Sequence, residues 1–153
     1  MIGILTSCDV PVESDLSART LEVSQADDAL SAIRIALPEQ YRFIAGYFVP
    51  PPFSGKSAYF LRYDDAEKVD LRALAEMNSS AEFGPVLQAK CASELSRYSL
   101  VSDMGLHCEE SMPLTVIRND GLGAGDLLAA GSQAIVVPEG DDPHQIYVYS
   151  EGT

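Results

Sequence analysis

Residues 84–98 carry the clearest helical period in the chain. Its apolar members are Leu87, Cys91, Leu95 and Tyr98, which recur at intervals of four, four and three residues. That spacing places the four side chains on one face of a helix. Pro85 suits the first helical turn, where a residue without an N–H loses no helical hydrogen bond. We therefore predict a helix over this stretch, with Leu87 and Leu95 buried beneath the rest of the fold.

Apolar and β-branched runs predict strands in other parts of the chain. They cover residues 2–6, 41–49, 57–63, 114–118, 134–137 and 145–149, and residues 16–23 allow one more short strand. The 41–49 run is apolar at successive positions, which favours a central strand. Because three prolines separate it from the next run, we expect the two to form a hairpin around a proline-rich turn.

Two further helices are predicted from capping residues and apolar stripes. Ser24 is a suitable N-cap, and the stripe that follows it ends at Pro38. Asp64, with Glu67 three residues later, is typical of a capping box and predicts a second helix that continues to Met77. The first stripe consists of Ala26, Ala29, Leu30, Ile33 and Leu37.

The order of these elements favours one α+β domain over residues 1–153. Strands and helices are interspersed, and several strands follow one another with short connections, which favours antiparallel pairing. We expect a mainly antiparallel sheet of about five to six strands, with the helices packed on one of its faces. No internal repeat or linker divides the chain.

Charge is the strongest global property of the sequence. Ten Lys and Arg stand against 23 Asp and Glu, which gives a formal net charge of −13. Phosphate backbones repel such a surface, so we expect no binding to nucleic acid and none to an anionic membrane. A basic protein would be attracted to it. Solubility alone is the plainer explanation of the same charge.

The N-terminus and the hydropathy of the chain bear on its location. No window reaches about 18 uninterrupted apolar residues, the length that a membrane-spanning helix needs. The first eight residues lack a basic region, and Asp9 follows them. We therefore expect neither a signal peptide nor a membrane span, and a cytoplasmic location.

Metal, cofactor and catalytic signatures are weak. The three cysteines, Cys8, Cys91 and Cys108, match no disulfide or zinc spacing. The turn Gly121–Asp126 lacks both the Lys-Ser/Thr ending of a phosphate loop and the third Gly of a dinucleotide loop. His107 next to Cys108, and His144 near Asp142, match no nucleophilic motif. We therefore predict no metal, no cofactor and no catalytic residue.

Carboxylates at strand ends are the best candidates for contacts with a partner, because loops present side chains there. They follow the second strand of the predicted central hairpin and occupy the last hairpin loop. The candidate partner-binding residues are Asp64, Asp65, Glu139, Asp141 and Asp142. Six tyrosines in predicted strands could add a recognition face, although β-propensity and core packing are the plainer explanation. These tyrosines are Tyr41, Tyr47, Tyr59, Tyr63, Tyr147 and Tyr149.

In size, acidity and element order the chain resembles bacterial immunity proteins, inhibitors and secretion chaperones. The resemblance is one of composition, and it covers no motif. It implies a non-enzymatic protein that binds a protein partner, including a basic one, through an acidic, Tyr-bearing surface. Two alternatives remain open: an enzyme or small-molecule-binding domain with a pocket between helices and sheet, and a subunit of a larger assembly.

Overall fold

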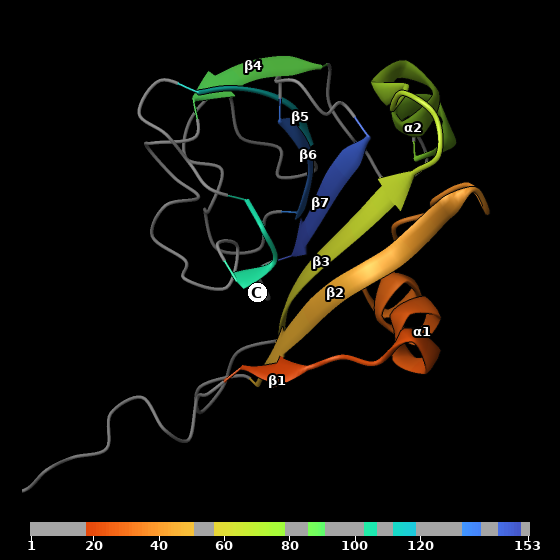
Figure 1. Cartoon of the computed structure of the whole chain (residues 1–153), viewed down its shortest axis with the longest axis vertical. Coiled ribbons are helices and arrows are strands. Elements are labelled where there is room, and N and C mark those ends of the chain that lie inside the picture. Colours follow the sequence, from red (N-terminus) through yellow and green to blue (C-terminus); the bar gives the residue numbers. More distant parts are fainter. Residues whose placement is uncertain are drawn as a thin grey trace, which may run out of the picture.

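The computed structural model describes residues 18–50, 57–78, 86–90, 103–106, 112–118, 133–138 and 144–150 (Figure 1). These residues form a mixed α+β structure with one seven-stranded antiparallel sheet and two helices. The strands are β1 (Arg19–Thr20), β2 (Tyr41–Val49), β3 (Ala58–Asp65), β4 (Leu87–Lys90), β5 (Pro113–Arg118), β6 (Gln133–Pro138) and β7 (Gln145–Ser150). The helices are α1 (Val23–Ile33) and α2 (Leu71–Met77). The strand count therefore exceeds the expected five to six.

The sheet consists of two groups of neighbouring strands joined at one ladder. Its order is β1-β2-β3-β7-β6-β5-β4, so the first three strands meet the last four where β3 pairs with β7. In that ladder Tyr59 lies opposite Ser150, and the register continues to Asp64 opposite Gln145. Every pairing is antiparallel, as the sequence predicted.

Most strands predicted from the sequence are confirmed. β2 has the predicted bounds, and β3 is its antiparallel hairpin partner. The runs at 114–118, 134–137 and 145–149 lie within β5, β6 and β7. The short strand allowed at 16–23 is β1, whereas the predicted strand at 2–6 lies outside the described residues.

The predicted helix over residues 84–98 is wrong where the structure describes it. Residues Leu87–Lys90 form β4, which pairs with β5 so that Leu87 lies opposite Val116. Leu87 and Ala89 are half-buried, while Val86 and Gln88 are exposed, which is the two-residue period of a strand. The ladder with β5 outweighs the local helical spacing. Residues 91–98, including Leu95, lie outside the described part of the chain.

The sheet carries a buried apolar cluster on each face. One cluster joins residues of both helices to strand residues that face them, and we call it the helix-side cluster. The cluster on the opposite face of the sheet we call the far-side cluster. Buried residues of the helix-side cluster are Ala26, Ala29, Ile33, Ile35, Tyr41, Leu61, Tyr63, Leu74, Ile117, Ile135, Val137, Ile146 and Val148. Buried residues of the far-side cluster are Phe60, Met104, Leu106, Leu114, Val116, Ala134, Val136, Tyr147 and Tyr149.

A bulge in β2 changes the face to which its side chains point. The register of the β2–β3 ladder shifts between Phe43 and Ala45. Phe43 packs with the helix-side cluster, its ring 5.6 Å from that of Tyr63, whereas Ala45 packs with the far-side cluster. Gly46 then lies on the helix side, where an added Cβ would come within 2.8 Å of a methyl carbon of Leu61. Glycine at this position lets the Phe43 ring and Leu61 close over the backbone.

Helix α1 begins and ends differently from the prediction. Glu22, rather than Ser24, is its N-cap, and the Glu22 N–H donates to the side-chain oxygen of Gln25 at 2.9 Å. The helix ends at Ile33, before Pro38 is reached, because Arg34 adopts a left-handed conformation with φ 57°. The buried stripe is confirmed at Ala26, Ala29 and Ile33, while Leu37 lies beyond the helix.

Helix α2 is held at its C-terminal end by a buried amide. Asn78, 2% exposed, accepts a hydrogen bond from the Ala36 N–H at 2.8 Å. Its Nδ2 donates to the carbonyl oxygens of Ala36 at 3.0 Å and Leu74 at 2.8 Å. The amide therefore joins α2 to the segment that follows α1. We call this set of three bonds the Asn78 clasp.

Replacing Asn78 with Ala should lower the free energy of unfolding by roughly 1–3 kcal/mol, because three hydrogen bonds are lost and a buried carbonyl loses a partner. Urea denaturation monitored by circular dichroism measures the change. The control is Glu76→Ala on the exposed side of the same helix, which should change stability by less than about 0.5 kcal/mol. If the two variants were equally stable, the three hydrogen bonds of the clasp would make no measurable contribution to the free energy of unfolding.

Candidate functional site

The β3–β7 ladder brings the end of β3 to the beginning of β7. Asp64 lies opposite Gln145, and the Asp65 N–H donates to the carbonyl oxygen of His144 at 2.8 Å. The N-terminal end of β2 lies at the same place, because Tyr41 pairs with Asp65. We call this end of the sheet, with the connection to α2, the β3–α2 corner (residues 64–70).

One of the two predicted groups of partner-binding acids, Asp64 and Asp65, lies at this corner. Asp64 and Asp65 end β3, and Glu139, Asp141 and Asp142 precede His144 in the sequence. Those last three residues lie outside the described part of the chain. The two acidic groups are more than 70 residues apart in the sequence, and the structure describes the first of them alone.

Asp65 is a buried structural residue rather than a surface one. Its side chain follows the alternation of Leu61 and Tyr63 and points to the helix side, where it is 6% exposed. One carboxylate oxygen accepts the Glu67 N–H at 3.0 Å, and the other accepts Gln40 Nε2 at 3.2 Å. These bonds fix the path of the chain as it leaves β3 toward α2.

The predicted capping box of Asp64 and Glu67 is not formed. Asp64 is still part of β3, and it is Asp65 that accepts the Glu67 N–H. The N-cap of α2 is Asp70, whose carboxylate accepts the backbone N–H groups of Arg72 and Ala73 at 3.1 and 3.2 Å. Sequence spacing identified the capping function at this corner but assigned it six residues too early.

Asp64 points to the opposite face and forms an ion pair with Arg62. Arg62 Nε lies 3.0 Å from one carboxylate oxygen of Asp64, and Nη2 lies 3.2 Å from the other. Both residues face the far side because they are two positions apart on one strand. The Asp64 side chain is 26% exposed, so part of the carboxylate remains accessible to solvent.

Arg62 also holds a separate segment against the far side of the sheet. Its Nη1 donates to the Met104 carbonyl oxygen at 2.7 Å. Gly105 has φ 101°, and an added Cβ would lie 2.6 Å from Nη1. Glycine is required there both for its conformation and for the close approach of the guanidinium. Sequence analysis did not single out Arg62, although its position two residues before Asp64 on a strand is a readable signal.

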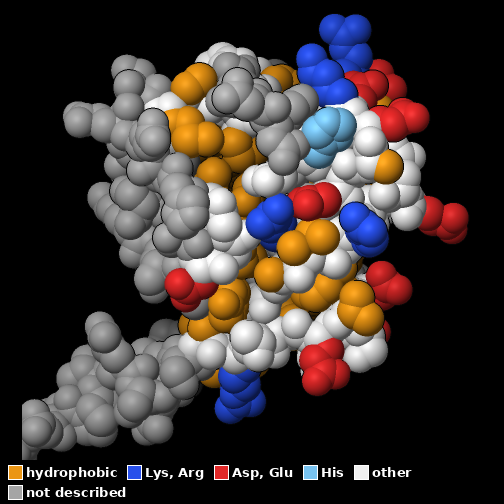
Figure 2. All heavy atoms as spheres, in the orientation of Figure 1, with side chains coloured by type: hydrophobic (Ala, Val, Ile, Leu, Met, Phe, Trp, Pro, Cys, Tyr) orange, Lys and Arg blue, Asp and Glu red, His pale blue; other side chains and the backbone are white. Residues whose placement is uncertain are grey.

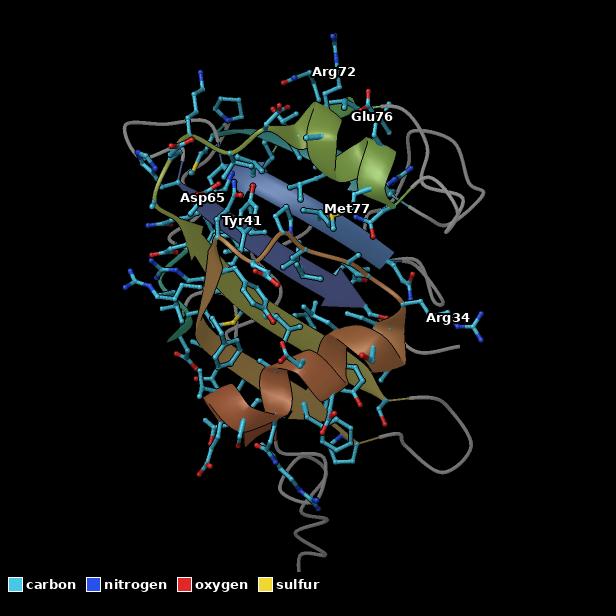
Figure 3. All side chains as sticks on the ribbon, turned by 90° about the vertical axis from the view of Figure 1, so that its right-hand side faces the viewer. Arg34, Tyr41, Asp65, Arg72, Glu76 and Met77 are labelled. Atoms are coloured by element: carbon cyan, nitrogen blue, oxygen red, sulfur yellow. The ribbon has the colours of Figure 1, made fainter. Side chains whose placement is uncertain are left out.

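Two buried tyrosines have strongly shifted pKa values. Burial, together with the charge of Asp65, raises the pKa of Tyr41 to about 12. Figure 3 shows Tyr41 and Asp65 together at the end of the sheet next to α2. Burial also raises the pKa of Tyr63 to about 12, with a smaller contribution from the charge of Asp27 on α1. Both phenols therefore stay protonated in the folded protein at neutral pH.

The predicted tyrosine recognition face is not a single surface. Tyr41, Tyr59 and Tyr63 pack on the helix side, and the other three pack on the far side. Only Tyr47 and Tyr59 are half-buried, and four are buried. The buried four are Tyr41, Tyr63, Tyr147 and Tyr149. Core packing accounts for these four. Of the six tyrosines, only the half-buried Tyr47 and Tyr59 are left for a recognition surface.

The described surface is nearly balanced in charge. The described residues include ten Asp and Glu and eight Lys and Arg. The whole chain has 23 Asp and Glu but only ten Lys and Arg. Figure 2 shows red and blue side chains interspersed on the visible face. Near the β3–α2 corner, exposed Glu67 and Asp70 alternate with exposed Lys68 and Arg72. The excess of carboxylates that the sequence predicts resides mainly in segments outside the described ranges.

Several residues considered for chemistry lie outside the described part of the chain. They are Cys8, Cys91, His107, Cys108 and the turn Gly121–Asp126. Among the residues that are described, no three His, Cys, Asp or Glu side chains gather in a way that could hold a metal ion. His144 is half-buried immediately before β7, where its carbonyl oxygen accepts the Asp65 N–H.

Comparisons with protein-family models, with curated proteins and with solved structures found no match. Across the described ranges, neither helix has the length and apolar character to cross a membrane.

The tyrosine pKa values predict how stability depends on alkaline pH. The folded-state pKa of Tyr41 and Tyr63 is raised from 10.0 to about 12, so the unfolded chain releases these protons first. The stability that the two phenols contribute is complete below pH 10.0 and is lost as pH rises toward 12. Urea denaturation across this range should therefore show a steeper loss for wild type than for a Tyr41→Phe/Tyr63→Phe double variant.

The matched control for this measurement is Tyr59→Phe, because Tyr59 is only half-buried on the same face. It should retain the wild-type pH dependence. If the double variant lost stability with pH as steeply as wild type and the control, the two phenols would not titrate as their burial requires.

Proposed function

We propose that this chain is a non-enzymatic module that binds a basic protein partner through carboxylates at the β3–α2 corner and in the 139–143 connection. The observation that carries the proposal is the pairing of β3 with β7. Asp64 lies opposite Gln145 and the Asp65 N–H bonds to His144, so the acidic end of β3 lies beside the residues that follow the 139–143 connection in the sequence. In the proposal Glu139, Asp141 and Asp142 extend this acidic end, because grouped carboxylates attract a basic surface more strongly than dispersed ones.

The carboxylates at this end have different tasks in the proposal. Asp65 is 6% exposed and bonded within the chain, so its contribution is to hold the corner. Asp64 is 26% exposed and keeps part of its carboxylate within reach of a partner, although Arg62 offsets its charge. Steering therefore falls mainly on Glu139, Asp141 and Asp142, together with the exposed Glu67.

Support for a binding module comes from the way polar groups are used in the described residues. The half-buried Arg62 and the buried Asn78 each bond to backbone groups of a separate segment, and the buried Asp65 bonds to the backbone N–H of Glu67 in the connection to α2. These are positioning contacts, because each one fixes the path of another part of the chain. The formal net charge of −13 also supports a binding function, since an attractive potential raises the association rate with an oppositely charged partner.

The test begins with affinity capture in the native host, followed by association and dissociation rates of the captured partner at several salt concentrations. We expect association to slow steeply with salt while dissociation changes little. A triple variant, Glu139→Gln/Asp141→Asn/Asp142→Asn, should associate roughly tenfold more slowly at low salt.

A matched variant, Asp27→Asn/Asp28→Asn/Asp103→Asn, removes the same number of negative charges from exposed positions on other parts of the surface. Its association rate should stay close to that of wild type. Equal effects of the two triple variants would indicate that only net charge matters, and salt-insensitive rates would contradict the proposal. Capture of nucleic acid or of small molecules alone would also contradict it.

A further inference from the structure

Helix α1 packs on the sheet through a few side chains. It lies against β2 and β3, its buried residues are Ala26, Ala29 and Ile33, and half-buried Leu30 packs against the same helix-side cluster. Two of these three are alanines, which bury little apolar area and therefore contribute little to holding the helix in place. Figure 3 shows α1 as a separate ribbon along β2 and β3, apart from α2.

A buried hydroxyl group beneath α1 makes its closed position less favourable. Tyr63 is 4% exposed in the helix-side cluster, and among the described residues its hydroxyl has no hydrogen-bond partner. The influence of Asp27 on the pKa of Tyr63 places the phenol on the α1 side of β3. A buried polar group without a partner forfeits the hydration that it would have in water. Opening of α1 would restore that hydration.

The C-terminal end of α1 carries a second unfavourable feature. Arg34 has φ 57°, in the left-handed region where a side chain with a Cβ is disfavoured. Helices usually place glycine at such a position. Figure 3 shows the Arg34 side chain extending away from the body of the molecule, while the Arg34 backbone N–H bonds to the carbonyl oxygens of Leu30 and Ser31.

Both ends of this segment are anchored independently of the helix. Before α1, the Leu21 N–H donates to the Gly46 carbonyl oxygen at 2.8 Å. After α1, the Asn78 clasp holds Ala36. Between these anchors, the Ile33 carbonyl oxygen accepts Gln133 Nε2 at 2.7 Å, which is a side-chain bond from β6 that opening must break.

We propose that α1 is a lid that opens as a unit between the anchors at Leu21 and Ala36 while the sheet remains folded. The lid covers Leu61 and Tyr63 on the helix side of β3 when closed. Elements with few buried contacts open with lower free energy than the core of the same protein. This inference concerns the fold and does not depend on the proposed function.

Native-state amide hydrogen exchange tests the proposal on the full chain. The α1 amides should exchange through an opening that is more frequent than that of the β3 and β7 amides. Val136→Ala is the decisive variant, because Val136 is 1% exposed and belongs to the far-side cluster, whereas α1 packs in the helix-side cluster. It should speed exchange of the sheet amides roughly tenfold and leave the α1 amides unchanged.

Two variants act on the lid itself. Tyr63→Phe removes a hydroxyl that has no partner within the described ranges and should slow α1 exchange about five- to a hundredfold, whereas Tyr59→Phe should not. Gln133→Ala should speed α1 exchange about fivefold by removing the bond to Ile33. The proposal is overturned if Val136→Ala speeds α1 and sheet amides equally, because α1 would then open only with the whole protein. It is also overturned if Tyr63→Phe leaves α1 exchange unchanged.

Discussion

The antiparallel ladder between β3 and β7 is the interaction on which the rest of the structure depends. It joins the strands formed by the first half of the described chain to those formed by the second half. Without it, Leu61 and Tyr63 would lose Ile146 and Val148 as neighbours on the helix side. The same ladder brings His144 to Asp65, so one pairing of strands contributes both to the core and to the candidate site.

Much of the fold could be predicted from sequence because its strands are strongly patterned. β2 was predicted with its observed bounds, since a nine-residue run rich in aromatic and β-branched side chains ends at a proline. β4 was missed because four residues carry little local signal, and their pairing with β5 is a long-range contact. A helical spacing through Leu87 is a local preference, and ladder hydrogen bonds with a buried neighbouring strand outweigh it.

The candidate site was only partly predictable, because the strand register decides the surroundings of each side chain. Sequence identifies carboxylates at strand ends, but it does not reveal which face each occupies once a register is fixed. Asp64 and Asp65 are adjacent in sequence, yet one is paired with Arg62 on the far side and the other is buried on the helix side. Capping by Asp70 and the Asn78 clasp likewise depend on backbone groups that only the folded chain presents.

The bulge in β2 has a consequence for self-association. β2 is a nine-residue, mostly apolar strand, and within the described part of the chain β1 pairs with two of its residues, Tyr47 and Phe48. A straight strand of this kind offers a long row of N–H and C=O groups to another chain and favours aggregation. The register shift between Phe43 and Ala45 interrupts that row, and the exposed Arg42 places a charge beside it. The irregularity that distributes side chains between two cores therefore also hinders edge-to-edge polymerisation.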